Sequence, residues 1–560
     1  MKLHYLVKIE DPKSHIVKIE ITGEWGQDFN LSFFLPSWSP GSYLMREYAR
    51  HVRSIAAFSG TGEPLYLEQK EKGVWNLDIS KSSLKNSPTS FSLVYEVYCH
   101  ELTVRTSHID ESHAFLHGPT YLMGILQKNI EPTLELRFPP LWSKVTTTLN
   151  DISTQREIFK YSSPSYDELI DTPIEIGCHE TDGFLVQGKE HTLAFYGIMY
   201  PHNQNIKKDI EIIVNFIASM MGEIPYARYA FITHLTPNSY GGLEHLDSCV
   251  LNFDGRKFSN RKEYIRFLSL VAHEYFHLYN VKRIRPKELG PFNYLQENYT
   301  SMLWLAEGLT SFVDDWVILQ AGLCTKEEYL DVIKDNLNNY FNTVGRKFHS
   351  LEQSSFNAWI KLYRPDENSN NSSISYYLKG GLVFLVLHIL LETKGKSCVH
   401  LLSLLWERYK KNPLEGLQTV EVFQMVEDLG SKEIRNIFET MVTTTEEIDF
   451  EKYFALGKIN IDWEEKGLWM GIQPEYQNER VFIRTLTLDS PAVKAGANAG
   501  DEILFLNGLR VLKNDWENMN NFLKKDVSYQ LLVSRLGSMV SLNLILQTSP
   551  RRVKKLLLVS

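Results

Sequence analysis

The stretch His273–His277 has the residue types and the spacing to hold a metal ion and activate a water molecule. It reads His-Glu-Tyr-Phe-His. Residues four apart lie on one face of a helix, so His273 and His277 can present two imidazole nitrogens to one ion. Glu274 follows His273 directly and can reach a water at that ion as general base. The spacing predicts a zinc ion and a hydrolytic reaction.

A third ligand is available about thirty residues further along the chain. Glu307 lies in the stretch Trp-Leu-Ala-Glu-Gly. Three protein ligands would leave one zinc position open to water or substrate, as in catalytic sites. The alternative is a buried histidine pair with purely structural hydrogen bonds. Because the bare motif arises by chance in about one in fifty chains of this length, the surrounding pattern has to decide.

The segments that carry these residues have helical patterns. Residues 262–272 contain no glycine or proline and space their apolar side chains helically, and residues 302–319 are also helical in pattern, with apolar residues throughout. The region 181–455 is predicted to be mainly helical after a few strands. Strands are expected near 193–200 and 229–235, and helices at 262–281, 302–320, 325–340, 375–392, 397–410, 418–428 and 431–441. The apolar run 380–391 is too short to span a bilayer and predicts a buried helix.

Residues 1–180 have the alternating pattern of β-strands. Runs such as 15–22, 31–36, 90–98 and 134–138 alternate apolar with polar residues and are separated by turn-forming clusters. They predict an antiparallel sandwich or a saddle-shaped sheet. A β-rich unit is expected again from 456 onward, and the basic residues near 551 predict a solvated tail.

Composition restricts the function classes. The chain has 560 residues, a net charge of -9 and 43% hydrophobic residues, so we expect several domains and no general nucleic-acid or membrane-surface binding. The five cysteines are scattered and include no Cys-x-x-Cys pair, which indicates a reducing compartment. The N-terminal residues lack the apolar core of a signal peptide. A cytoplasmic location is the simplest expectation.

Several motifs, in order along nearly the whole chain, resemble the M61 peptidase family, whose named member is glycyl aminopeptidase. They are Trp38–Arg50, Tyr166–Gly177, Gly241–His245, His273–Pro286, Leu303–Ser311 and Ser375–Gly380. The resemblance implies a multidomain α+β protein with an N-terminal antiparallel β domain (1–180). It also implies a thermolysin-like, mainly helical catalytic domain of the gluzincin type (181–455) and a C-terminal PDZ domain (456–550), followed here by the basic tail (551–560). One zinc ion per chain and cleavage of residues from peptide N-termini are implied as well.

Further site residues follow from the similarity of Gly241–His245 to the Gly-x-Met-Glu-Asn loop of M1 aminopeptidases. That likeness implies an edge strand along the cleft, with Gly241 and Gly242 at the substrate and Glu244 binding its α-ammonium group. A fixed negative charge near the metal would also set the cleavage register. Without the resemblance, Glu244 would be a surface residue in a turn. The role of His245 stays open between substrate contact and loop structure.

The segment Ser375–Gly380 resembles the part of M1 enzymes that supplies the oxyanion-stabilising tyrosine. Counting back from Lys379 assigns this role to Tyr377 rather than to Tyr376. A phenol that donates to the developing oxyanion stabilises it by about 3 kcal/mol in comparable sites. The alternative is that both tyrosines belong to the core.

The chain departs from the related patterns at the position that orients a zinc histidine. Thermolysin has an aspartate four residues after its glutamate ligand, where this chain has Ser311. The residues that orient the histidines must therefore differ. Asp314 and Asp315 are candidates for this orienting role, although the pattern favours exposed carboxylates on the helix. The basic run of Lys282, Arg283 and Arg285 predicts a substrate-carboxylate site, a solvated helix end or internal ion pairs.

The C-terminal region independently resembles a PDZ domain in the run Ser490–Asn507. The candidate carboxylate-binding loop is Gly467–Ile472, where backbone N–H groups could hold a peptide end while the peptide adds a strand to the sheet edge. The alternative is a domain that only packs against the rest of the chain.

Taken together, these features predict a zinc aminopeptidase that acts on peptides with unblocked N-termini. A zinc endopeptidase of the same fold and a non-catalytic, PDZ-containing peptide-binding protein remain the alternatives. The intact Glu274 weighs against the second of these.

Overall fold

The computed structural model describes residues 1–24, 30–82, 89–155, 158–465, 467–519 and 523–559. The chain forms two compact units. The first consists of residues 1–299, 313–324 and 406–416, and the second of residues 300–312, 325–405 and 417–560. Two helices, α4 (Leu309–Gln320) and α9 (Cys398–Lys411), are divided between the units.

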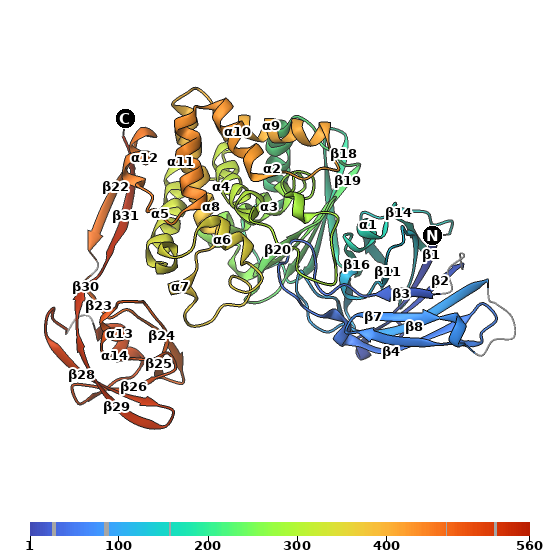
Figure 1. The fold of residues 1–560 in the computed structure, drawn as a ribbon, viewed down its shortest axis with the longest axis horizontal. Helices are drawn as coiled ribbons and strands as arrows, with labels where there is room; N and C mark the ends of the chain where they lie inside the picture. Colours follow the sequence, from blue (N-terminus) through green and yellow to red (C-terminus); the bar gives the residue numbers. More distant parts are fainter. Residues whose placement is uncertain (25–29, 83–88, 156–157, 466, 520–522, 560) are drawn as a thin grey trace. The chain divides into compact units, whose positions relative to one another are not determined.

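β-Sheets form the beginning of the first unit (Figure 1). Among the described residues, one sheet has the strand order β14-β15-β12-β1-β2-β8-β4-β5, a second β13-β16-β10-β9, and a third β11-β3-β7-β6. Strand β8 alternates buried and partly exposed residues, as expected for a sheet with one face on a core. The strands are β1 (Lys2–Lys8), β2 (Ile16–Glu24), β3 (Asn30–Phe34), β4 (Val52–Ser59), β5 (Pro64–Leu65), β6 (Leu67–Glu71), β7 (Val74–Asp78), β8 (Ser90–Tyr98), β9 (His108–Ile109), β10 (His113–Leu116), β11 (Gly124–Ile125), β12 (Glu131–Arg137), β13 (Lys144–Thr146), β14 (Asn150–Asp151), β15 (Phe159–Ser162) and β16 (Ile174–Gly177); helix α1 is Tyr166–Ile170.

A five-stranded sheet and two long helices complete the parts of the first unit that carry the site. The strand order is β17-β18-β19-β21-β20, so β20 forms an edge of the described sheet and pairs antiparallel with β21. Helices α2 and α3 bury apolar faces in this unit. The elements are β17 (Glu180–Val186), β18 (Lys189–Gly197), α2 (Ile206–Met221), β19 (Arg228–Leu235), β20 (Tyr240–Glu244), β21 (Ser248–Phe253) and α3 (Arg261–Phe276).

The second unit begins with helices around α8 (Tyr376–Glu392), which is buried along most of its length. This explains the apolar run that the sequence analysis assigned to a buried helix. A π-helical turn, Trp304–Gly308, leads directly into α4. The other helices are α5 (Lys326–Asn342), α6 (Leu351–Phe356), α7 (Ser369–Ser372), α10 (Thr419–Leu429), α11 (Lys432–Thr443) and α12 (Phe450–Leu456).

A β-rich region with its own apolar core ends the second unit. Its largest sheet has the order β24-β25-β26-β28-β29, with β27 paired to β26, and two strand pairs, β22-β31 and β23-β30, accompany it. The elements are β22 (Ile459–Glu465), β23 (Leu468–Trp469), β24 (Ile472–Gln477), β25 (Arg480–Leu486), α13 (Pro491–Lys494), β26 (Glu502–Leu506), β27 (Leu509–Arg510), α14 (Lys513–Asn518), β28 (Ser528–Arg535), β29 (Ser538–Ile545), β30 (Gln547–Thr548) and β31 (Arg551–Leu558).

The C-terminal residues differ from the solvated extension that their basic composition predicted. Residues 551–558 form strand β31, which runs beside β22 (Figure 1). Val553 and Leu556 are buried, and Asn338 of α5 exchanges two hydrogen bonds with the Val553 backbone. The basic residues occur in adjacent pairs and the two buried positions are three residues apart, because the pairing with β22 skips Lys554 in a β-bulge. Ser560, the last residue of the predicted tail, lies outside the described residues.

The helices expected from the sequence are present with ends shifted by a few residues, whereas α2, α12 and the short helices α1, α6, α7, α13 and α14 were not predicted. In the described part of the chain, no helix combines the length and the apolar character needed to cross a membrane.

Candidate metal centre and active site

Helix α3 carries His273 and Glu274 and ends at Phe276, directly before His277. Asn260 caps its first turn by accepting a hydrogen bond from the Glu263 N–H. The His277 N–H donates to the His273 carbonyl, which keeps the last turn helical. The two imidazole rings lie edge to face with 4.6 Å between their centroids, on one side of the helix as the spacing predicted.

In each histidine of this pair, Nδ1 forms a hydrogen bond. His273 Nδ1 lies 2.7 Å from Asp314 Oδ2, and His277 Nδ1 lies 2.7 Å from the Asn280 carbonyl oxygen. Both partners are acceptors, so both rings carry the proton on Nδ1 and would bind a metal through Nε2. The expectation of exposed helix carboxylates is wrong for Asp314, which is buried against His273.

Asp314 replaces the aspartate whose usual position is occupied here by Ser311. It lies seven residues after Glu307, which is two helical turns instead of one. In the sequence, Asp314 has the spacing of a residue on the same helical face as Glu307. This spacing alone does not distinguish it from a surface carboxylate. Its neighbour Asp315 accepts a hydrogen bond from Ser269 Oγ. Burial, together with the charge of Asp314, raises the pKa of Asp315 to about 8.

Glu307 lies in the π-helical turn that precedes α4 and is 1% exposed. One ligand atom each from His273, His277 and Glu307 lies within 4.8 Å of the others. A π-helical turn shifts the side chains that follow it around the helix, and such turns recur at functional sites. His273 and His277 belong to the first unit and Glu307 to the second, and all three remain the predicted zinc ligands.

Strand β20 passes directly beside Glu274. A Cβ added to Gly242 would lie 2.2 Å from Glu274 Oε1, so only glycine allows the strand to approach the carboxylate this closely. Gly241 has a φ of 146° and open space beside it. The edge position of β20 agrees with the expected strand along the cleft.

Glu244 ends strand β20 and is buried in the first unit. Ligand atoms of Glu244, Glu274 and His277 lie within 4.8 Å of one another. Among the described residues, Glu244 Oε1 has no hydrogen-bond partner. Gly41, from the predicted marker Trp38–Arg50, packs on this carboxylate, because a Cβ there would lie 2.5 Å from both of its oxygens. The reading of Glu244 as a surface residue is therefore wrong.

A cavity of 220 Å³ lies beside Glu244 in the first unit. Trp38, Gly41 and Phe292 supply much of its apolar wall, and Lys282 and Arg285 also line it. The cavity thus combines the buried Glu244 carboxylate with two basic side chains.

The basic side chains that follow α3 form most of their contacts inside the protein. Lys282 pairs with Asp171 at 2.7 Å, and Arg283 donates to the carbonyls of Leu246, Leu278 and Pro225. His245 Nδ1 lies 3.2 Å from the same Asp171, and the Leu246 N–H also donates to it. Asp171 thus fixes the loop after Glu244, a role that the sequence analysis did not assign. The internal ion-pair reading is confirmed for Lys282 and Arg283.

Tyr376 and Tyr377 start helix α8 in the second unit, where Ser375 caps the first turn. Tyr376 is fully buried, whereas Tyr377 is partly exposed and its hydroxyl lies 3.2 Å from that of Tyr363. Burial, and then the negative charge of Glu307, raises the pKa of Tyr377 well above its ordinary value. The phenol therefore keeps its proton and can donate it in a hydrogen bond.

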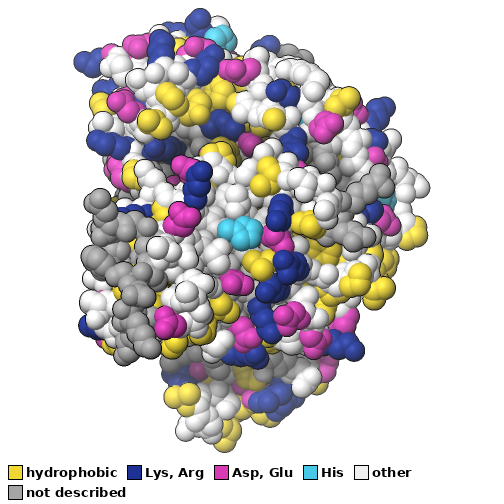
Figure 2. Space-filling model, turned by 90° about the vertical axis from the view of Figure 1, so that its right-hand side faces the viewer, with side chains coloured by type: hydrophobic (Ala, Val, Ile, Leu, Met, Phe, Trp, Pro, Cys, Tyr) yellow, Lys and Arg dark blue, Asp and Glu magenta, His cyan; other side chains and the backbone are white. Residues whose placement is uncertain are grey.

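The surface drawn in Figure 2 carries basic and acidic side chains next to one another. This intermixing agrees with the small net charge of the chain.

Comparison with known proteins places this site in a family. Family models match residues 4–178 as the peptidase M61 N-terminal domain and residues 266–383 as M61 glycyl aminopeptidase. An aminopeptidase N family protein from Idiomarina loihiensis has a structure similar to this one, with a TM-score of 0.91 and 26% sequence identity over 99% of this chain and 98% of that chain. An M1 zinc metallopeptidase from Deinococcus radiodurans shares the fold at a TM-score of 0.51 and 11% identity, over 80% of this chain and 94% of its own. A search of curated proteins gives no match.

The fold and the gathered residues define a zinc metallopeptidase. The two family models together cover more than half of the chain, which belongs to the M61 peptidase family. The multidomain α+β architecture, with an N-terminal β domain and a helical catalytic region, is confirmed.

The residues present fit the zinc ion that this class uses. Two imidazoles and one carboxylate form a donor set of catalytic zinc sites, and the hydrogen bonds on both Nδ1 atoms are the kind that orient zinc-bound histidines.

Proposed function

We propose that the protein is a zinc aminopeptidase, which removes the N-terminal residue from peptides. The observation that carries the proposal is the position of the buried Glu244 carboxylate, within 4.8 Å of Glu274 and His277 and with one oxygen lacking a partner among the described residues. A substrate α-ammonium group would satisfy that oxygen through a charge-assisted hydrogen bond. With the ammonium fixed at Glu244, only the first peptide bond would reach the reacting groups.

We assign the metal to His273, His277 and Glu307. A zinc ion held there supplies Lewis acidity, which polarises the scissile carbonyl and makes water more acidic. The Asp314 carboxylate and the Asn280 carbonyl hold the two imidazoles in orientation through Nδ1.

Glu274 is the proposed general base and acid. Its carboxylate takes a proton from the attacking water and delivers it to the leaving amine. The glycines at 241 and 242 let the β20 backbone approach Glu274, and the edge position of this strand leaves room for a substrate backbone to pair with it. Tyr377 is the proposed donor to the oxyanion, as the similarity of Ser375–Gly380 to M1 enzymes implies. Besides burial, the charge of Glu307 acts on the pKa of this phenol, which agrees with a position near that proposed ligand.

The C-terminal β-rich region is proposed to be a PDZ domain that binds a peptide end at Gly467–Ile472. In support, β24 starts at the end of this loop and forms an edge of the described sheet, where an added strand could pair. A fluorescently labelled peptide series with carboxylate or amidated C-termini would test it; equal or absent binding of both forms would contradict it.

The aminopeptidase proposal is tested with matched peptides that carry either an unblocked or an acetylated N-terminus. The zinc-loaded wild type should cleave only the unblocked forms. Glu244→Gln keeps the shape but removes the charge, so kcat/KM for these peptides should fall by about 10- to 100-fold, as expected for a charged hydrogen bond. Equal cleavage of the acetylated forms by wild type would point to an endopeptidase. No cleavage of either form would favour a non-catalytic peptide-binding protein.

A further inference from the structure

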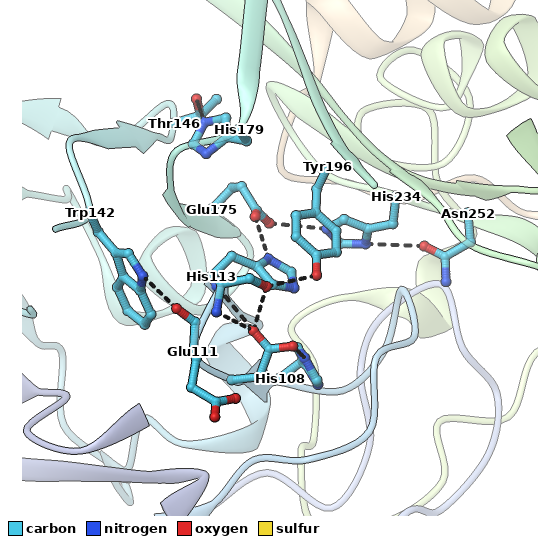
Figure 3. Close-up of polar contacts among 12 residues, drawn as sticks. His108, Glu111, His113, Trp142, Thr146, Glu175, His179, Tyr196, His234 and Asn252 are labelled. Atoms are coloured by element: carbon cyan, nitrogen blue, oxygen red, sulfur yellow. Dashed lines mark hydrogen bonds and ion pairs between the residues drawn. The ribbon is translucent and has the colours of Figure 1, made fainter. Parts of the chain in front are cut away.

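A second group of metal-ligand side chains lies in the first unit, around strands β9 and β10. His108, Asp110 and His113 each offer one ligand atom, and the three atoms lie within 4.8 Å of one another. Figure 3 shows His108 and His113 close together. None of these residues belongs to the proposed active site. The stretch reads His-x-Asp-x-x-His along the chain.

His113 is held in one tautomer by a buried carboxylate. Its Nδ1 lies 2.6 Å from Glu175 Oε1, and the ring is completely buried. The other oxygen of this buried carboxylate, Oε2, lies 3.0 Å from His234 Nε2, so the carboxylate accepts a hydrogen bond from each ring. The proton therefore lies on Nδ1 of His113. Its Nε2 carries a lone pair, and no described residue donates a hydrogen bond to it.

His108 has the same arrangement with a different partner. Its Nδ1 lies 2.5 Å from the His100 carbonyl oxygen, which can only accept. Its Nε2 lies 3.2 Å from Asp110 Oδ2, so the carboxylate faces either the lone pair of a neutral ring or the N–H of a protonated one.

Asp110 is the third acceptor. The Ser112 hydroxyl, the Ser112 backbone N–H and the His113 backbone N–H all donate hydrogen bonds to Oδ1 of Asp110. Oδ2 is therefore the oxygen that faces His108.

His113 Nε2, which has no hydrogen-bond partner among the described residues, therefore faces His108 Nε2 and the Asp110 carboxylate, and this group needs a positive charge, supplied by a metal cation or by a proton on His108. We propose that His108 Nε2, Asp110 Oδ2 and His113 Nε2 form a second site for Zn²⁺, in addition to the one zinc ion expected at His273 and His277. The outer hydrogen bonds support this assignment. One histidine is oriented by a carboxylate and the other by a backbone carbonyl, which is the same pair of partners found on His273 and His277.

The surroundings point to a structural role for this ion. Glu175 of β16 bridges His113 and His234 of β19, and the ring of Tyr196 in β18 stacks on His113 at a centroid distance of 3.3 Å (Figure 3). All three proposed ligands belong to the β9–β10 hairpin, so the ion would fix this hairpin, and Glu175 links His113 onward to the five-stranded sheet within the first unit. His108 and Asp110 are partly exposed, which leaves a route for the ion from solvent.

Zinc binding by full-length His273→Ala/His277→Ala separates this site from the active site. After chelator treatment and dialysis against ZnCl₂, this variant should retain about one zinc ion per chain, and the wild type about two. Zinc should raise the unfolding temperature of the variant. Adding Asp110→Asn, which preserves the shape of the side chain, should weaken the remaining zinc binding by at least about 10-fold.

His100→Ala is the matched control, because its side chain is not a proposed ligand and the backbone carbonyl used by His108 is retained. It should leave zinc binding unchanged. Absence of zinc in folded His273→Ala/His277→Ala protein would overturn the proposal and would mean that a proton on His108 balances the site. Retention of full affinity after Asp110→Asn would also overturn it. Failure of peptide cleavage by the wild type would bear on the proposed function alone.

Discussion

Glu244 and Glu274 lie close together beside His277, and both carboxylates are buried. Two carboxylates at this separation repel each other, and burial makes each negative charge more costly. A zinc ion and a substrate ammonium group are the positive charges that would balance them. The residues thus form a site whose electrostatics are complete only when metal and substrate are bound.

Replacing Glu274 by glutamine should abolish most of the activity without removing the metal. The amide cannot accept the proton of the attacking water, and a general base contributes about 10²- to 10⁴-fold to the rate. We expect kcat to fall within that range while zinc content, measured by elemental analysis, stays at the wild-type value. Wild-type turnover by the variant would show that another group is the base.

Replacing Asp314 by asparagine should weaken zinc binding by about 10- to 100-fold. The change removes a charged partner of His273 Nδ1 but preserves the shape of the side chain. Competition with a zinc-binding dye gives the affinity directly.

The neighbouring Asp315→Asn is the control for this change. Asp315 contacts Ser269 and has a raised pKa of about 8, so it is largely protonated at neutral pH and the amide imitates that form. Zinc affinity should change little. Equal losses in both variants would contradict the specific role of Asp314.

At the level of elements, the site depends on a helix and an edge strand that approach each other unusually closely. Apolar spacing predicted α3 and the helices of the second unit, because a 3.6-residue period is strong over long segments. It did not predict the contact between β20 and α3. That contact depends on the absence of a side chain at Gly242, and a local pattern does not identify the neighbour of a glycine.

The residues of the candidate site also differ in how far the sequence could predict them. His273, Glu274 and His277 were predictable because their geometry is set by one helix. The position of Glu244 was inferred only through the family resemblance. Asp171 and Asp314 were not assigned, since hydrogen bonds between distant segments leave no periodic signal in the sequence.

Adding a methyl group at Gly242 should disrupt the site without unfolding the protein. The Cβ would meet Glu274 Oε1 at 2.2 Å, so either the base or the strand must move. We expect Gly242→Ala to lower kcat/KM by about 100-fold, as a displacement of about 1 Å does in other sites. Gly381→Ala is the control, because the nearest atom there is at an ordinary 3.4 Å. Peptide hydrolysis and circular dichroism measure both effects, and unchanged activity in Gly242→Ala would contradict the close approach.

Helix α8 carries a buried lysine that should make stability depend on pH. Burial lowers the pKa of Lys379 from 10.5 to about 8. Between these pH values the unfolded chain binds the proton more often than the folded chain does, so stability rises with pH across this window. The effect is at most about 3 kcal/mol.

Lys379→Met should remove this dependence. Compared with wild type, the variant should be relatively more stable at pH 7, and this advantage should shrink between pH 8 and 10.5. Unfolding temperatures across that range test the prediction. A difference that stays constant with pH would mean that Lys379 keeps its ordinary pKa.

For the molecule as a whole, the likeness to the Idiomarina loihiensis protein extends over 99% of the chain, whereas the family models end at residue 383. The C-terminal β-rich region is thus a shared part of this architecture. Strand β31 returns to pair with β22 and contacts α5, so this region is tied to the helices of its own unit.

The central claim, removal of single residues from peptide N-termini, is tested most directly by product analysis of one unblocked peptide. Zinc-loaded protein is incubated with a peptide of about ten residues, and the products are followed by mass spectrometry over time. We predict a series of peptides shortened one residue at a time from the N-terminus, absent with Glu274→Gln. Internal fragments as the first products would contradict the account and identify an endopeptidase.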